Sequence, residues 1–306
     1  MSKKKKELIG IGILISTIIV VGVLVLSYIV SMKLIMPERA RVMSNPMKKI
    51  GLKYEDISFD SDGNKIKGWY IPSEKNKFTV VYSHGYKGNR ESSSLTAYDM
   101  MKEVHRLGGN FLTFDFSGEG QSQGKIVTVG YREQQDLKNA IKYAKKKSKS
   151  PIFLYGISMG ASTTVCVASK NPNGVIGAIC DSPFSNLKEY LENNLSKWSG
   201  LPNFPFMPII ISMEEKIAGL DINKVDPRGY VKNLKIPMLI MHGKGDPKIP
   251  YTESIRIANN NKKYISLHII DNNGHCQSLK KKRKQYLGYF DDFIEKNLKN
   301  NYYAHR

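Results

Sequence analysis

The sequence predicts an α/β fold in which a mostly parallel sheet is flanked by helices. Two observations lead to this prediction. From about residue 78 to residue 179, short apolar segments alternate with amphipathic ones, as is typical of parallel strands joined by crossover helices. The chain has 306 residues and is 41% hydrophobic, which is enough for one large domain with a substantial buried core.

The expected elements follow in order from residue 54. Two strands at 54–59 and 66–71 flank turn-forming residues at 60–64, which predicts a hairpin at an antiparallel edge of the sheet. Further strands are expected at 78–82, 110–114, 152–155, 175–179, 237–241 and 264–270, with helices at 91–107, 131–147, 161–169, 252–260 and 279–297.

The alternation of strands and helices breaks between residues 182 and 236. This stretch has no clear strand and is rich in aromatic residues, methionine and proline. We expect it to leave the sheet as a partly helical insertion at about 183–235. An excursion of this kind can form a lid over a pocket.

The N-terminal region has the clearest compositional signal. A basic cluster at residues 3–6 precedes residues 8–32, which contain no charged side chain and are mostly Ile, Leu and Val. A transmembrane helix needs about 20 apolar residues. The apolar part of a cleaved signal peptide, the competing interpretation, is about 7–15 residues long and ends at small residues. We expect a basic tail at 1–7, an uncleaved transmembrane anchor at 8–32 and a juxtamembrane linker at 33–52.

Charge and cysteine content bear on the location of the protein. The basic cluster at 3–6 favours a cytoplasmic N-terminus, which predicts a single-pass membrane protein with its main domain outside the cytoplasm. Basic residues after the apolar run reduce the charge contrast, and three scattered cysteines point mildly the other way. The formal net charge of +20 favours contact with acidic surfaces such as anionic lipid headgroups.

A candidate nucleophile lies between the strand at 152–155 and the helix at 161–169. Residues 156–160 read Gly-Ile-Ser-Met-Gly and match the pattern G-x-S-x-G. A nucleophilic serine must stand on a sharp strand-to-helix turn, where crowding requires small residues such as Gly156 and Gly160 two positions away. We therefore predict Ser158 as the nucleophile. The alternative is a tight turn that carries an ordinary exposed serine.

A serine hydroxyl needs a base to accept its proton and an acid to orient that base. His275 lies in a loop after the last predicted strand, and Asp246 follows the strand at 237–241. Ser158, Asp246 and His275 therefore follow the chain order nucleophile, acid, base. Asp181, which follows the strand after the nucleophile, is the alternative acid.

Two backbone amides are expected to stabilise the oxyanion of the reaction. One belongs to Met159, directly after the nucleophile. The other belongs to Tyr86, in the loop after the strand at 78–82. His84 and Gly85 precede it as a supporting turn, in which glycine lets the backbone approach the substrate closely.

Three motifs together resemble the α/β-hydrolase superfamily. Residues 84–89 (His-Gly-Tyr-Lys-Gly-Asn) are similar to the H-G-x-x-G-N segment of a bacterial membrane-anchored branch, which includes serine aminopeptidase-like (S33), cinnamoyl-esterase-like and ABHD-type hydrolases. Residues 115–122 are similar to its D-x-R-G-x-G-x-S turn, with Ser117 where the family usually has arginine, and residues 226–237 resemble the stretch before the acid-bearing strand. The resemblance covers about 54–297 and implies an α/β-hydrolase domain over 53–306.

The predicted activity is hydrolysis of a carboxylic ester or thioester through an acyl-enzyme, on a small-molecule or lipid-like acyl substrate. A serine peptidase or aminopeptidase and an acyltransferase would use the same groups, and a non-catalytic binding module is the alternative from another class. No cofactor or metal is expected, because no metal-ligand spacing is visible. Nucleic acid is not an expected partner, since the basic runs at 145–147 and 280–284 lack interleaved aromatic residues.

Overall fold

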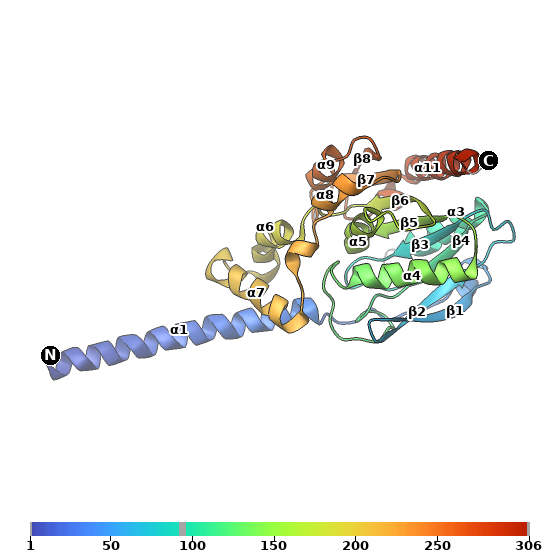
Figure 1. Ribbon diagram of the computed structural model, residues 1–306. Coiled ribbons are helices and arrows are strands. Elements are labelled where there is room, and N and C mark those ends of the chain that lie inside the picture. The colour runs from blue at the N-terminus through green and yellow to red at the C-terminus, as the bar shows by residue number, and fades with distance from the viewer. Residues whose placement is uncertain (1, 92–95, 305–306) are drawn as a thin grey trace.

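The computed structural model describes residues 2–91 and 96–304 and is built around a mixed sheet (Figure 1). The strands are β1 (Glu55–Ser61), β2 (Asn64–Ile71), β3 (Thr79–Ser83), β4 (Asn110–Phe114), β5 (Ile152–Ile157), β6 (Val175–Asp181), β7 (Met238–Gly245) and β8 (Ile265–Asn273). Among the described residues they form one eight-stranded sheet in the order β1-β2-β4-β3-β5-β6-β7-β8. The pairs β1–β2 and β2–β4 are antiparallel and the other neighbours are parallel. The predicted fold class and its antiparallel edge are confirmed.

Helices connect the strands and cover both faces of the sheet. The α-helices are α1 (Lys3–Ile35), α2 (Pro46–Ile50), α3 (Thr96–Arg106), α4 (Glu133–Lys147), α5 (Met159–Ala168), α6 (Leu187–Ser199), α7 (Asn203–Ala218), α8 (Pro227–Tyr230), α9 (Thr252–Asn259), α10 (Ser278–Lys281) and α11 (Arg283–Ala304). Two 3-10 turns, η1 (Ile222–Lys224) and η2 (Val231–Asn233), complete the insertion between β6 and β7. Residues 92–95 of the helix expected at 91–107 lie outside the described residues, as do residues 1 and 305–306.

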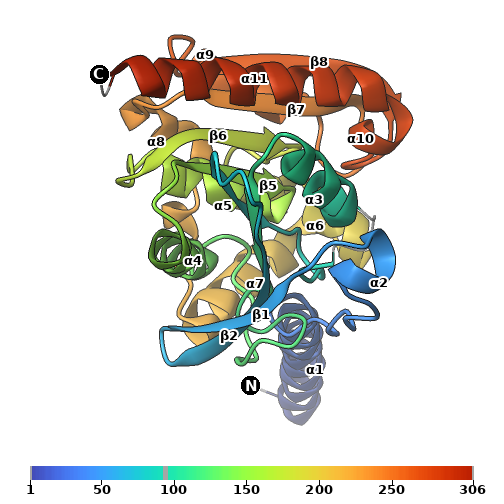
Figure 2. The ribbon, with the colours of Figure 1, turned by 90° about the vertical axis from the view of Figure 1, so that its right-hand side faces the viewer.

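The hydrophobic core has two parts, one on each face of the sheet. Side chains of α4, α5 and α9 pack on one face, and those of α3 and α11 pack on the other. Figure 2 shows α4 and α3 on opposite sides of the sheet. Strand β3 contributes to both parts, because Val80 and Tyr82 point to one face and Val81 to the other, and all three are buried. Burial on both faces explains why this strand is a continuous apolar run rather than an alternating one.

Helix α1 leaves the main domain as a long rod (Figure 1). Among the described residues it is the one helix long and apolar enough to cross a membrane. It extends beyond the apolar run at both ends. At the N-terminus, the Ser2 side chain accepts a hydrogen bond from the Lys5 amide and caps the helix. At the C-terminus, α1 ends before Pro37, because a proline disfavours helical backbone at the residue that precedes it.

The segment expected as a juxtamembrane linker lies against the main domain. Arg39 donates a hydrogen bond of 2.6 Å to the carbonyl oxygen of Ser122. Asn89 donates hydrogen bonds to the carbonyl oxygens of Ala40 and Arg41. These contacts tie α1 and the segment after it to the rest of the fold.

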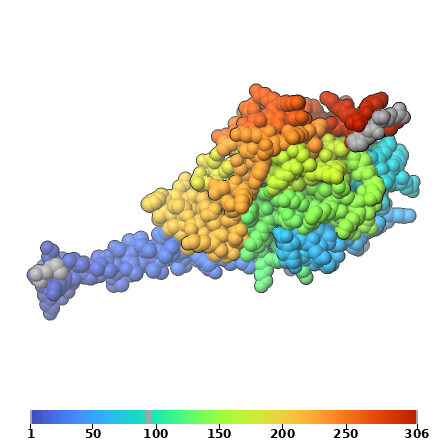
Figure 3. Space-filling model, in the orientation of Figure 1, coloured from blue at the N-terminus to red at the C-terminus, as the bar shows by residue number. Residues whose placement is uncertain are grey.

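The insertion between β6 and β7 contains a helical hairpin, which we call the cap and define as residues 187–218, comprising α6, α7 and the turn between them. As expected, the described residues between β6 and β7 form helices and turns. In the space-filling view the cap is a lobe that extends from the main domain beside α1 (Figure 3). The cap therefore lies beside the edge of the sheet at which the parallel strands end. The loops that carry the predicted site residues meet at this edge.

Candidate active site

The turn between β5 and α5 holds Ser158 in an unusual backbone conformation, with φ of 53° and ψ of −122°. Side chains with a Cβ rarely adopt a positive φ, so the surrounding structure must impose it. The two glycines of the motif show how tight the turn is. A Cβ on Gly156 would lie 2.3 Å from the carbonyl oxygen of Gly160, and a Cβ on Gly160 would lie 2.2 Å from that of Ser83. Only glycine fits at either position.

The structure brings Ser158, His275 and Asp246 together in one line of hydrogen bonds. The Oγ atom of Ser158 lies 2.7 Å from Nε2 of His275. Nδ1 of His275 lies 2.7 Å from Oδ2 of Asp246. The three residues follow β5, β8 and β7, and parallel strands bring their carboxyl ends to the same edge of the sheet. In this arrangement Ser158 donates to the imidazole, and the imidazole donates to the carboxylate.

Asp246 is held by donors on both of its oxygens. The amides of Lys248 and Ile249 donate to Oδ1, and His275 donates to Oδ2. Nε2 of His242 lies 3.5 Å from the same Oδ2 atom. Burial alone would raise the pKa of Asp246, but the nearby His242 ring and the hydrogen bonds from His275 and the Ile249 amide outweigh burial and hold that pKa well below its usual range. The group facing His275 is therefore an ionised carboxylate.

His242 is a supporting residue that was not predicted from the sequence. It is fully buried, and Nε2 donates to the carbonyl oxygen of Ile249 at 2.9 Å. The Ser254 hydroxyl donates to Nδ1 at 2.6 Å. The ring thereby fixes the loop that carries Asp246. The sequence feature that could have pointed to His242 is its place in a His-Gly pair at the end of a predicted strand.

Asp181, the alternative acid, has other partners. Its carboxylate accepts hydrogen bonds from the hydroxyls of Ser182 at 2.9 Å and Tyr286 at 3.1 Å. Its backbone oxygen accepts from the amide of Ser158 at 2.8 Å. Burial raises the pKa of Asp181. The residue braces the turn of Ser158, while the imidazole of His275 is bonded to Asp246.

The loop after β3 lies directly against Ser158, because a Cβ on Gly85 would be 3.2 Å from the Cβ of Ser158. His84 stabilises this loop through hydrogen bonds of its buried ring. Its Nε2 accepts from the amide of Phe116 at 3.1 Å, so its proton resides on Nδ1, which donates to the carbonyl oxygen of Gly85 at 2.8 Å. Burial lowers the pKa of His84, which keeps the ring neutral.

The two residues expected to supply oxyanion donors are the one directly after Ser158 and one in the loop that contacts Ser158. The amide of Met159 is at the first position of α5, where helical amides have no partner within the helix. The amide of Tyr86 follows Gly85 in the loop that contacts Ser158. The hydroxyl of Tyr86 donates a 2.6 Å hydrogen bond to the carbonyl oxygen of Leu34, in the last turn of α1.

A buried carboxyl group, Glu119, fixes the other end of the Tyr86 loop. Its Oε1 accepts the amide of Lys87 at 2.5 Å. Burial raises the pKa of Glu119 well above its ordinary value. Glu119 was not predicted as a functional residue, although it lies inside the turn at 115–122. The turn at 115–122 therefore supports the Tyr86 loop through Glu119, which occupies an unspecified (x) position of the motif.

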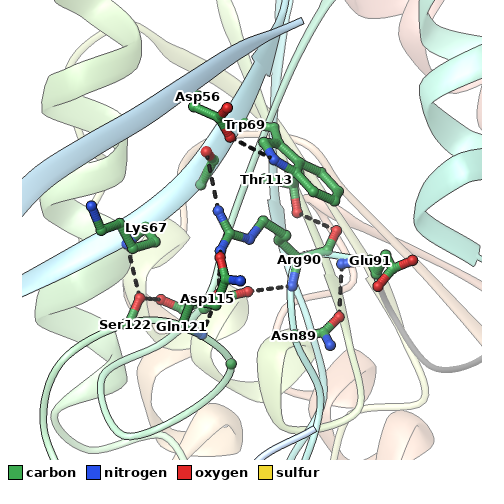
Figure 4. Close-up of polar contacts among 12 residues, drawn as sticks. Asp56, Lys67, Trp69, Asn89, Arg90, Glu91, Thr113, Asp115, Gln121 and Ser122 are labelled. Atoms are coloured by element: carbon green, nitrogen blue, oxygen red, sulfur yellow. Dashed lines mark hydrogen bonds and ion pairs between the residues drawn. The ribbon is translucent and has the colours of Figure 1, made fainter. Parts of the chain in front are cut away.

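A buried ion pair joins the same turn to the end of the Tyr86 loop (Figure 4). The guanidinium of Arg90 lies 3.1 Å from the carboxylate of Asp115, and the Arg90 amide donates to the same carboxylate at 2.6 Å. The amide of Gln121 also donates to Asp115 at 2.8 Å. The Arg90 guanidinium lies 5.2 Å from the ring of Trp69, a cation–π geometry. The ion pair thus ties the loop and the turn into one rigid unit.

Ser117, which stands in place of the usual arginine, makes a different set of contacts. Its amide and hydroxyl both donate to the carboxylate of Asp136, at 2.9 Å and 3.1 Å. Burial raises the pKa of Asp136 to about 7. In this chain the guanidinium groups of Arg90 and Arg39 both contact the turn, through Asp115 and Ser122 respectively. Within the described ranges, no group of three or more His, Cys, Asp or Glu side chains is placed to hold a metal ion.

Comparison with known proteins gives several matches. The sequence matches the family described as serine aminopeptidase, S33, over residues 74–215. It is similar to the uncharacterised protein YqkD of Bacillus subtilis (strain 168), with 26% identity over 95% of this chain and 97% of the relative. The lysophosphatidylserine lipase ABHD12 of Mus musculus is 26% identical over 61% of this chain and 46% of that enzyme.

Solved structures share the fold. The esterase Pf2001 of Pyrococcus furiosus aligns with a TM-score of 0.70 and 25% identity, over 85% of this chain and 98% of the esterase. The acylaminoacyl peptidase of Pyrococcus horikoshii aligns with a TM-score of 0.65 and 21% identity, over 82% of this chain and 43% of the peptidase. Since the described sheet and its helices match these folds over most of this chain, and relatives match in sequence, the chain belongs to the α/β-hydrolase superfamily and is a hydrolase of that type.

Proposed function

We propose that the protein is a membrane-anchored serine hydrolase that cleaves carboxylic ester or thioester bonds, with Ser158 as its nucleophile. The observation that supports this most directly is the continuous set of hydrogen bonds from Ser158 through His275 to Asp246, with 2.7 Å at each step. A binding module without catalysis has no need of an ionised acid, an oriented imidazole and a serine on a strained turn.

The proposed reaction has two halves. In the first, Ser158 Oγ attacks the carbonyl carbon of the substrate while Nε2 of His275 accepts the hydroxyl proton, and Asp246 stabilises the imidazolium. The amides of Met159 and Tyr86 stabilise the oxyanion. The tetrahedral intermediate then expels the alcohol or thiol, which takes the proton from His275. In the second half, water attacks the acyl-enzyme with His275 as base, and the carboxylic acid and free Ser158 are released.

The named relatives and the cap support an acyl substrate with an apolar part. The similar proteins include an esterase and a lipase, and the cap beside the site is rich in aromatic residues and methionine. We place the enzyme in the membrane through residues 8–32. A peptidase or aminopeptidase and an acyltransferase are the alternative activities of the same groups.

Labelling with a fluorophosphonate tests the nucleophile. We expect the wild-type protein to be labelled and Ser158→Ala to be unlabelled, with both showing the same thermal unfolding profile. Absence of label on folded wild-type protein would rule out the serine hydrolase and leave the binding module.

A substrate panel tests the bond that is cleaved. Nitrophenyl esters of increasing chain length, which release nitrophenol, are compared with aminoacyl nitroanilides, which release nitroaniline. We expect higher kcat/KM for the esters, and a preference for the amides would replace the esterase assignment with the aminopeptidase. Product analysis with added alcohol acceptors would reveal an acyltransferase.

A further inference from the structure

The position of α1 relative to a bilayer follows from its length and composition. The hydrocarbon layer is about 30 Å thick, and a helix rises about 1.5 Å per residue, so about 20 residues cross it. The apolar run begins at Leu8, directly after Glu7. If α1 spans the bilayer, the hydrocarbon layer therefore ends near Ser27. Ser27 is also the first buried residue along α1.

The cap lies beside α1 from this level onward. The hydroxyl of Ser31 lies 3.4 Å from the carbonyl oxygen of Ile210 in α7. Val30 and Leu34 pack against the cluster that includes Met207 and Ile210. Figure 1 shows the cap along the C-terminal half of α1, with the turn between α6 and α7 toward the N-terminal side. That turn therefore lies at the level where α1 leaves the hydrocarbon layer.

The tip of the cap, residues 198–208, is mostly apolar and is partly open to solvent, although Met207 is buried. It contains no charged residue. Trp198 is 46% exposed and Phe204 is 83% exposed. Tyr28 of α1, near the same level, is also exposed. Aromatic residues with a polar edge concentrate at the boundary between headgroups and hydrocarbon, whereas a group of exposed aromatic side chains is unfavourable in water.

The loop beside the nucleophile is close to this level. Tyr86 is bonded to Leu34, and Leu34 lies about 10 Å along α1 from Ser27 at 1.5 Å per residue. The amide of Val127 also donates to the carbonyl oxygen of Ile35. The end of α1 therefore contacts the loop beside the candidate site, about 10 Å beyond the level where the bilayer would end.

We propose that the tip of the cap inserts into the headgroup boundary of the bilayer beside α1, and that the site acts on acyl lipids that reside in that bilayer. The partner that covers the exposed apolar tip is thus the lipid surface itself. The assignment of a lipid substrate rests on the proposed function, whereas the insertion of the tip depends only on α1 spanning the membrane.

Tryptophan fluorescence tests the insertion. The full-length protein, which has two tryptophans, is reconstituted into phosphatidylcholine vesicles brominated at defined acyl positions. Trp198 is on the tip, and Trp69 is buried in the sheet with 3% exposure. We expect quenching of the wild type that is strongest with bromine near the carbonyl end of the chain, and no quenching of Trp198→Phe. Equal quenching of the two proteins would overturn the insertion.

Activity on two substrates tests the lipid assignment. Phe204→Glu places a charge on the tip, and we expect its kcat/KM on long-chain acyl lipids in vesicles to fall by about tenfold, with no change on a short, water-soluble nitrophenyl ester. Tyr303→Glu, an exposed position on α11, is the matched control and should change neither. Equal activity of Phe204→Glu and wild type on vesicle lipids would overturn the inference. Inactivity of the wild type on both substrates would refute the proposed function, while the quenching result would still decide insertion.

Discussion

At the scale of single residues, the candidate site depends on which carboxylate orients His275. Asp246 and Asp181 both end parallel strands close to Ser158, so chain order alone left both open. In the structure the donors from His242 and the following amides keep Asp246 ionised, whereas Asp181 lies in a buried pocket with Tyr286. The two residues therefore have different expected effects on catalysis.

Neutral isosteres separate these two roles. Asp246→Asn should lower kcat by about 10⁴-fold, because an amide in this position favours the wrong imidazole tautomer. Asp181→Asn retains an acceptor for Tyr286 and should change kcat far less. Both are measured on a nitrophenyl ester with folding checked by thermal unfolding. A larger loss in Asp181→Asn than in Asp246→Asn would contradict the assignment.

At the scale of elements, the strands and the motif-bearing turns could be predicted because their signals are local. The apolar run of β3 and the two glycines around Ser158 are visible in a few consecutive residues. The residues that support the loop after β3 could not be predicted in this way. Glu119 and Arg90 bond to residues about 30 positions away in sequence. The position of the cap was also hidden, because α7 packs on α1, which precedes it by more than 150 residues.

Replacement of glycine by alanine is expected to have opposite effects on stability in the turn of Ser158 and in α11. Gly160→Ala places a Cβ 2.2 Å from a backbone oxygen and should strongly destabilise the fold or prevent it. Gly288→Ala is in the middle of α11, where a Cβ meets nothing within 4 Å, and should raise the free energy of unfolding by about 1 kcal/mol through helix propensity. Thermal unfolding in detergent measures both. A Gly160→Ala protein as stable as wild type would show that the turn is less crowded than described.

The cap contains a carboxyl group that makes its stability depend on pH. Glu214 of α7 is buried, and its Oε1 has no hydrogen-bond partner among the described atoms. Burial raises its pKa from the ordinary 4.5 to about 8. The folded state therefore binds a proton that the unfolded chain releases between these values, and the free energy of unfolding falls as pH rises through this window.

Glu214→Gln removes this dependence. The Tm of the variant relative to wild type should increase from pH 5 to pH 8 and then level off. Melting curves of the detergent-solubilised proteins across this range measure it. A Tm difference that does not change with pH would indicate that Glu214 is ionised in the folded protein.

At the scale of the whole molecule, α1 and the main domain are held together by hydrogen bonds. Arg39 and Asn89 fix the segment after α1, and Tyr86 bonds to its last turn. The side of the membrane follows only from the charges around the apolar run. We expect the domain outside the cytoplasm, because residues 3–6 are a basic cluster at the N-terminal side.

Protease treatment of intact cells tests this orientation. Externally added protease should remove the main domain from cells that express the full-length chain, while a cytoplasmic marker protein stays intact. Protection of the domain until the cells are lysed would place it in the cytoplasm. The loss of the fluorophosphonate-labelled band from intact cells gives the same readout at the site itself.

If α1 spans a membrane as proposed, the continuous helix from Lys3 to Ile35 would also set the height of the candidate site above that membrane. Because no flexible joint separates the apolar run from the turn bonded to Tyr86, a thicker bilayer would draw the cap deeper and a thinner one would raise it or tilt α1. Lipid chain length would then act on the enzyme twice, once as the substrate and once as the thickness of the layer in which the enzyme is suspended.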